Sequence, residues 1–234
     1  MNGRSRVQGL ILRFFLSAFH WCLRRWEVLF FLVVYILLGL QVYFFYFDIR
    51  LLSGLHGAIA AFASFDSFIA TRLTYVTLPA IYLPLVYLLL QAERPAWARR
   101  YFDALGLYVV FRMAIQLAGL NILVFDSVSS RFLLITQLLF FLPYSLLVWG
   151  WIYWRLDASA RGGQRTLFRL DCEGEVPRPI DYFVASFSSV FSPSINAIKG
   201  NSARARILIL GHGFLIYDVM GLTLSRAVAL VQSR

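Results

Sequence analysis

The chain has 234 residues, of which 60% are hydrophobic, and a mean hydropathy of +0.70. A soluble domain of this length does not bury so much apolar surface, so the composition predicts an all-α, polytopic integral membrane protein. The net charge is +10 and the pI about 10.1. In a membrane protein this charge indicates positive-inside loops and contacts with anionic lipid headgroups, and we expect no nucleic-acid partner.

Residues 1–26 are predicted to form a basic amphipathic helix. Arg6, Arg13 and His20 are spaced by seven residues, so they share one side of a helix whose other positions are mostly apolar. A helix of this kind lies in the headgroup plane. The alternative is a plain basic flank that fixes the orientation of the first span, and we expect no cleaved signal peptide.

Five apolar stretches of about 20 residues predict crossings of the membrane. The predicted spans are 27–47, 68–90, 102–125, 131–154 and 203–231. The first three belong to an N-terminal region, 27–129, in which residues 48–66 are predicted to be an interfacial or re-entrant piece. A sixth crossing, at 51–65, is the alternative.

The C-terminal region, 130–234, has a plan of its own. After the span 131–154 come a polar linker at 155–179, a short amphipathic helix with a Ser/Pro/Asn loop at 180–200, and the last span. A short helix, a polar loop and a spanning helix are the plan of a tetrameric cation-channel pore. We therefore expect a helix bundle with a re-entrant, pore-helix-like segment.

This stretch resembles the pore of potassium channels, whose filter reads Thr-Thr-x-Gly-Tyr-Gly-Asp. When Tyr182-Phe183 is aligned with the common Tyr-Phe of the pore helix, the filter falls on residues 189–195 without a gap. Ala203-Arg204 and Tyr217 also match residues common in bacterial members. Every signature residue of the filter is replaced: Ser189 and Val190 stand for Thr, Ser192 and Ser194 for Gly, Pro193 for Tyr, and Ile195 for Asp.

The replaced filter changes the function that the resemblance implies. Potassium filters use Gly because their carbonyls point at the ion from unusual backbone angles, and Pro193 fixes φ at about −65°. We expect a tetramer whose loop offers hydroxyls and carbonyls to monovalent ions with little potassium selectivity, or a sealed pore. The alternative is a Ser-Pro sequence that only turns the chain. The filter-like residues are Ser188, Ser189, Phe191, Ser192, Pro193, Ser194 and Asn196.

The chain also resembles a family of bacterial multi-pass membrane proteins that carry a Phe-Ser-Pro-Thr-Asp motif. The matching residues are 153–157 (Tyr-Trp-Arg-Leu-Asp), Gly162-Gly163 and 191–194 (Phe-Ser-Pro-Ser). The resemblance implies a bacterial inner membrane protein. It implies no function, and Ser194 and Ile195 depart from the Thr-Asp of the motif.

Two charges are predicted inside spans, where ionisable groups are costly and suggest function. Asp218 lies near the middle of the last span, and Arg112 lies in the third span, with Gln116 one turn further on. Asp218 is predicted either to form a cation-attracting ring in an oligomeric pore or to form a latch with Arg112.

His212 lies between Gly211 and Gly213 in the last span. A histidine here is either a pH-sensitive gate or a hydrogen-bonded structural residue. Three basic residues flank the start of the same span: Lys199, Arg204 and Arg206. They are predicted to repel cations, to bind lipid phosphate, or simply to anchor the helix at the interface.

We expect no enzyme, no cofactor and no metal site. His20, His56 and His212 share no metal-ligand spacing, and the sequence has neither a Gly-x-Ser-x-Gly elbow nor a phosphate loop. The alternative to a channel-like protein is a non-conducting membrane scaffold or accessory subunit that retains the pore-like frame.

The two arguments about orientation disagree. Regions 1–26, 91–102 and 154–206 hold 16 of the 22 Lys and Arg residues, and five spans place all three regions on one side. The positive-inside rule makes that side, and the N-terminus, cytoplasmic. A potassium-channel pore loop faces outward instead, which a sixth crossing would restore. We favour five spans with the N-terminus inside.

Overall fold

A computed structural model describes most of the chain. The described residues are 25–51, 57–91, 93–125, 131–162, 166–172, 176–191 and 197–232. Most of the predicted N-terminal helix over 1–26 lies outside this part of the chain. Residues 192–196 of the filter-like loop lie outside it as well.

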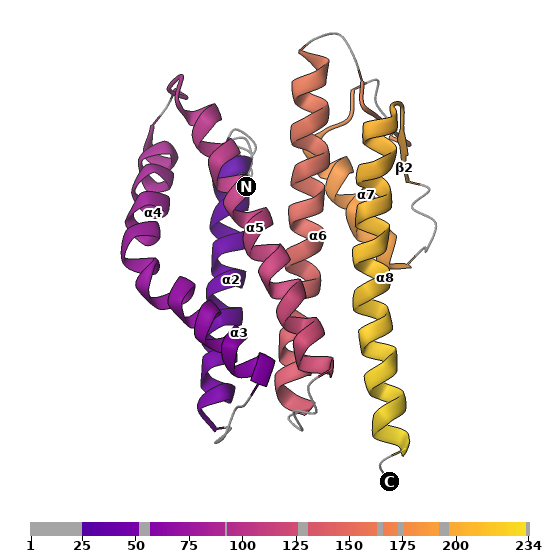
Figure 1. Ribbon diagram of the computed structural model, residues 1–234. Coiled ribbons are helices and arrows are strands. Elements are labelled where there is room, and N and C mark those ends of the chain that lie inside the picture. Colours follow the sequence, from indigo (N-terminus) through magenta and orange to yellow (C-terminus); the bar gives the residue numbers. More distant parts are fainter. Residues whose placement is uncertain are drawn as a thin grey trace, which may run out of the picture.

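Four helices are long and apolar enough to cross a membrane. They are α2 (Trp26–Leu51), α5 (Ala98–Phe125), α6 (Arg131–Arg161) and α8 (Ala203–Gln232), and they run lengthwise through the bundle in Figure 1. Their length and composition confirm the prediction of a helical, polytopic membrane protein.

The predicted span 68–90 is not one helix. The chain between α2 and α5 is made of α3 (Gly57–Ser67), the π-helical turn η1 (Phe68–Arg72) and α4 (Thr74–Leu90). At 1.5 Å per residue, the 17 residues of α4 extend only about 26 Å, less than the ~30 Å of a bilayer core. Three short elements, α3, η1 and α4, therefore replace a single spanning helix. We call them the arm, and they lie beside the four long helices (Figure 1).

The linker contributes one strand to a small sheet that the sequence did not predict. Strand β1 (Phe168–Leu170) pairs antiparallel with β2 (Ile198–Gly200), so that Phe168 lies opposite Gly200. The short helix α7 (Pro179–Phe191) lies between the two strands in sequence. Strands of three residues are too short to show alternation in a sequence, which explains why neither was predicted.

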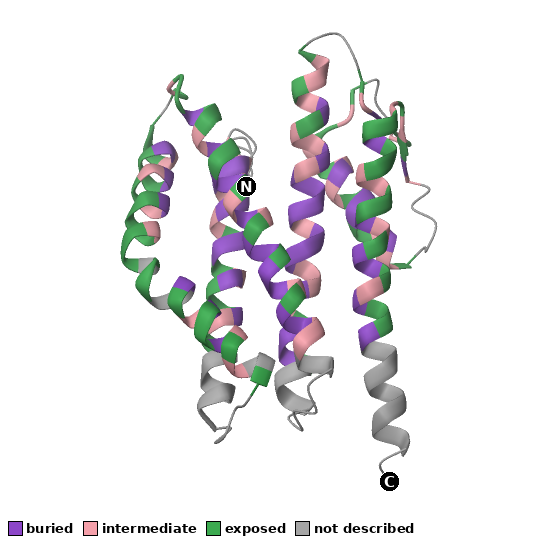
Figure 2. Ribbon diagram, in the orientation of Figure 1, coloured by how far each residue is buried: buried purple, intermediate pink, exposed green. Residues whose placement is uncertain are grey.

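Close packing joins α6 to its neighbours. A Cβ added at Gly106 of α5 would lie 2.0 Å from the Trp151 ring, and one added at Gly150 of α6 would lie 2.4 Å from the Phe183 ring. The two glycines let Trp151 and Phe183 press against the neighbouring backbone. Figure 2 shows buried residues concentrated on α5 and α6, with exposed residues along the outer side of α4.

Candidate functional site

The C-terminal half contains a chain path that leaves one end of the bundle and returns to it. β1 precedes α7, β2 follows it, and the two strands are hydrogen-bonded to each other. Asn201 N also donates to Leu167 O at 2.9 Å, which closes the base of the path. The 13 residues of α7 extend about 20 Å, too short to cross a bilayer core of ~30 Å.

The two faces of α7 differ in chemistry. Its buried residues are Tyr182, Ala185, Ser186 and Ser189, and its exposed apolar residues are Ile180, Val184, Phe187 and Phe191. The apolar stripe follows a helical spacing of three or four residues. Phe191 is 88% exposed, so α7 ends at the surface of the single chain.

The described filter-like serines turn inward. Ser189 is buried and donates to Ser186 O at 2.6 Å, while Ser186 donates to Leu146 O on α6 at 2.7 Å. Ser188 is half-buried and donates to Ala185 O at 2.9 Å. In the single chain, Ser189 therefore contacts its own bundle. The remaining filter-like residues, Ser192, Pro193, Ser194 and Asn196, lie outside the described residues.

His212 is fully buried where α6, α7 and α8 meet. Its Nδ1 lies 3.0 Å from the Tyr153 hydroxyl and its Nε2 lies 3.4 Å from Ser189 Oγ. Because the one Ser189 proton goes to Ser186 O, Ser189 accepts from Nε2–H and Nδ1 accepts from Tyr153, an arrangement that suits a neutral imidazole. We call Trp149, Tyr153, Ser189 and His212 the His212 cluster; the Trp149 ring stacks on the imidazole at 4.9 Å.

The two glycines beside His212, Gly211 and Gly213, differ in how far they are buried. Gly211 is exposed, and a Cβ there would meet only Trp149, at an ordinary 3.9 Å. Close helix packing therefore does not require glycine at this position. Gly213 is half-buried. A gating role for Gly211, His212 and Gly213 stays a prediction.

The predicted latch between Asp218 and Arg112 is wrong. Arg112 Nη1 donates to Asp66 Oδ1 at 2.8 Å, and Asp218 Oδ2 instead accepts from Asn121 Nδ2 at 2.9 Å. Arg112 and Asn121 are about 14 Å apart along α5, so Asp218 lies at a different depth from the arginine. This offset could not be predicted, because hydropathy along the chain does not show the depth of α8 against α5.

The three basic residues before and within α8 are exposed. Lys199 lies on β2, and Arg204 and Arg206 lie in the first turn of α8. Arg206 Nε donates to Gly200 O at 3.3 Å, which joins α8 to the small sheet. Their position at the end of the bundle fits interfacial anchors, and the cation-repelling role stays a prediction.

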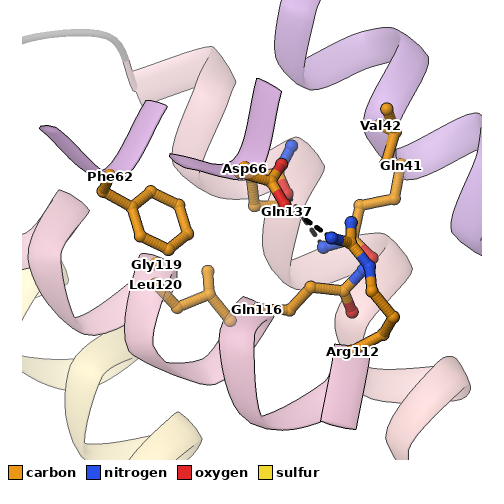
Figure 3. A pocket seen from close by; sticks show the side chains of 9 residues that line it. All are labelled: Gln41, Val42, Phe62, Asp66, Arg112, Gln116, Gly119, Leu120 and Gln137. Carbon is orange, nitrogen blue, oxygen red and sulfur yellow. Dashed lines mark hydrogen bonds and ion pairs between the residues drawn. The ribbon is translucent and has the colours of Figure 1, made fainter. Parts of the chain in front are cut away.

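A polar cluster inside the N-terminal half was largely missed by the sequence analysis. Besides the Asp66–Arg112 ion pair, Gln41 Nε2 donates to Gln137 Oε1 at 2.9 Å. Figure 3 shows these side chains converging from α2, α3, α5 and α6 on one small cavity. We call Gln41, Asp66, Arg112, Gln116 and Gln137 the Arg112 cluster; all five residues are buried. Only Arg112 and Gln116 were recognised from the sequence.

The Arg112 cluster is incompletely paired. Four of its atoms have no hydrogen-bond partner among the described residues: Gln41 Oε1, Gln116 Oε1, Gln116 Nε2 and Gln137 Nε2. Each unpaired buried polar group costs about 1–3 kcal/mol. A cluster of this kind in an apolar bundle points to a site that holds a further polar group.

Ion pairs gather three chain segments at one end of the bundle. Glu27 at the start of α2 binds Arg94 at 2.7 Å and approaches Arg155 at the end of α6 at 3.5 Å. Arg155 also binds Asp103 at 2.7 Å. The same end carries the linker and the start of α8 (Figure 1), and we call it the basic end.

Asp157 organises the linker at the basic end. It is fully buried, and its Oδ1 accepts from Leu167 N at 2.7 Å and from Phe168 N at 3.1 Å. Its Oδ2 accepts from the Tyr182 hydroxyl and pairs with Arg161 at 3.1 Å. Burial raises the pKa of the Tyr182 phenol, and the hydrogen bond with Asp157 adds to the shift. Asp157 is the aspartate of the Leu-Asp motif in the second resemblance. Its hydrogen-bond partners could not be predicted from the sequence.

Comparisons with known proteins found no match among family models, curated proteins or solved structures. The two family resemblances noted in the sequence therefore stay predictions. Within the described residues, no three His, Cys, Asp or Glu side chains come together as they would to hold a metal ion.

Proposed function

We propose that the protein is a channel-like membrane protein in which several copies, most simply four, surround a shared axis. The observation that supports this proposal is the path of residues 168–200. The short α7 leaves the β1–β2 pair, ends at the exposed Phe191, and is followed by a polar segment that returns to β2. A second copy would meet this chain at the exposed end of α7.

The chemistry of α7 favours cations at this place. The carboxyl end of a helix carries a partial negative charge of about half an elementary charge. The loop that follows adds hydroxyl, carbonyl and amide oxygens from Ser192, Ser194 and Asn196. Without the filter glycines, the proposed pore passes monovalent cations with little preference for potassium.

We assign the basic end to the cytoplasmic side of a bacterial inner membrane. The proposal rests on the gathering of the start of α2, the 91–97 connection and the end of α6, joined through Glu27, Arg94 and Arg155. Anionic lipid headgroups would surround this end. A membrane-impermeant thiol reagent added outside intact cells should fail to label Ala160→Cys, and labelling there would reverse the orientation.

A specific observation favours a second candidate, a non-conducting scaffold or accessory subunit. Ser189, at the first filter position, is buried in its own bundle, and so is the nearby Ser186. In this candidate, α7 is a packing element and the loop is sealed. A copurifying partner protein and a monomer or dimer in native mass spectrometry would support it.

Recordings from the purified protein in planar bilayers distinguish the two candidates. We expect cation currents that Ser194→Lys, with a charge added in the filter-like loop, reduces strongly. Ser159→Lys adds the same charge at an exposed position of the basic end and should leave the currents unchanged. Absence of current across voltage, pH and membrane tension would overturn the channel proposal.

A further inference from the structure

The Arg112 cluster encloses a cavity that is separate from the proposed pore. Its volume is about 20 Å³, which exceeds the ~10–15 Å³ that one water molecule needs by the same measure. Gln116 is 8% exposed, and neither of its polar atoms has a partner among the described residues. Gln116 and Arg112 both line the cavity, together with the amides of Gln41 and Gln137 (Figure 3).

The charges of the cluster select the chemistry of an occupant. Arg112 and Asp66 both line the cavity and neutralise each other at 2.8 Å. The pair carries no net charge, so nothing in the cavity offsets the cost of desolvating a bare ion of either sign. The unpaired atoms include two carbonyl oxygens and two amide nitrogens, so the matching occupant is uncharged and both donates and accepts hydrogen bonds. Water fits this description and this volume.

A second cavity lies next to the Arg112 cluster. A cleft of about 210 Å³ lies between α2, α4 and α5, and it shares Val42 and Arg112 with the smaller cavity. Three tyrosines, Tyr35, Tyr82 and Tyr108, line it together with Thr77. The Tyr35 hydroxyl is buried and has no partner within the described part of the chain.

We propose that the Arg112 cluster is a water-binding site, reached from the aqueous phase through the cleft between α2, α4 and α5. The cleft is hydrated while the outer face of α4 meets lipid. The site excludes ions, and it would exist whether or not the protein conducts.

Cysteine labelling tests the access route. In a variant with Cys22 and Cys172 replaced by Ser, Thr77→Cys places a thiol in the cleft. Val76→Cys is its control, because it lies at nearly the same depth and is 69% exposed, yet it does not line the cleft. In lipid nanodiscs, a charged methanethiosulfonate should modify Thr77→Cys at least tenfold faster. Equal rates, or a faster reaction at Val76→Cys, would show that lipid fills the cleft and would overturn the route.

Hydroxyl radicals generated by X-rays test the inner cavity, because they oxidise buried side chains next to bound water. Leu120 lines the cavity and is 2% exposed, whereas Leu85 is equally buried and lines neither cavity. We expect Leu120 to be oxidised several-fold faster than Leu85 in the wild-type protein, and Gln116→Leu to remove the difference. Equal oxidation of the two leucines in the wild type would mean a dry cavity and would refute the proposal.

Discussion

The two halves of the bundle bury polar groups in opposite ways. In the N-terminal half, the Arg112 cluster joins four helices through an ion pair and three amides, and four of its atoms lack partners among the described residues. In the C-terminal half, the His212 cluster joins α6, α7 and α8 through uncharged groups, and both ring nitrogens of His212 face a hydroxyl. Among its polar side-chain atoms, the Trp149 indole nitrogen lacks a partner within the described residues. The difference separates an uncharged cluster with one unpaired atom from a charged cluster with four.

The two clusters should respond differently to mutation. In a low-dielectric interior, a network with most of its polar atoms paired rigidifies the structure, while one with several unpaired atoms depends on an additional group such as water. Removing one member of a buried ion pair also leaves an isolated charge, which is far more costly than losing a neutral hydrogen bond. Mutations should therefore harm the N-terminal half most.

The largest effect is expected for Arg112→Met. It leaves the Asp66 carboxylate buried without its partner and should lower the free energy of unfolding by about 3–5 kcal/mol. Thermal denaturation in detergent, followed by size-exclusion chromatography, measures the loss. The double variant Asp66→Leu/Arg112→Met removes both charges and should recover most of it. A stable Arg112→Met single variant would contradict the role of the ion pair.

The second largest effect is expected for Asp157→Ala, which should lower the free energy of unfolding by about 3 kcal/mol. The substitution leaves the Leu167 and Phe168 N–H groups and the Tyr182 hydroxyl without their acceptor. Asp181→Ala is the matched control, because Asp181 accepts from Arg178 N at an exposed site and should cost under about 1 kcal/mol. Limited proteolysis of the linker, in parallel with thermal denaturation, locates the damage. Equal losses in the two variants would show that Asp157 does not hold the linker.

A smaller effect is expected in the His212 cluster. His212→Phe keeps the ring stacked near Trp149 but leaves the Tyr153 hydroxyl unpaired, so we expect a loss of about 1–2 kcal/mol. Ser189→Ala leaves the buried His212 Nε2–H without its acceptor, so we expect a loss of similar size. If currents are recorded, their pH dependence should be the same in wild type and His212→Phe. A shifted pH dependence would identify His212 as a gate.

The smallest effect is expected for Asp218→Asn. The new amide can still accept from Asn121, so stability should change by less than about 1 kcal/mol. Ion selectivity should not change if Asp218 stays in this contact between α5 and α8. Reduced cation preference in bilayer recordings would instead place Asp218 on an ion path.

The sequence predicted those features that depend on hydropathy along the chain. The short helix predicted within 180–200 is α7 at Pro179–Phe191, and the last helix, predicted at 203–231, is α8 at Ala203–Gln232. Long apolar runs and helix-ending residues are local signals, which a single sequence displays. The break at η1 was missed because the apolar run through residues 68–90 continues across it.

The pairings inside the bundle could not be read in this way. Arg112 and Gln116 were recognised as unusual, but Asp66 lies 46 residues before Arg112, on a short helix that was assigned to the interface. Gln41 and Gln137 are separated by 96 residues, and nothing in either neighbourhood points to the other. Partners that meet through helix packing depend on the rotation and depth of each helix, and one sequence fixes neither.

If copies of this chain meet where α7 ends, cysteines placed there should cross-link from one copy to another. Phe191→Cys, in a background without the native cysteines, should form disulfide-linked pairs in native membranes under mild oxidation. Leu83→Cys is 70% exposed before substitution but lies on the arm, and it should remain monomeric. A Phe191→Cys protein that stays monomeric, or that cross-links no faster than Leu83→Cys, would contradict the account.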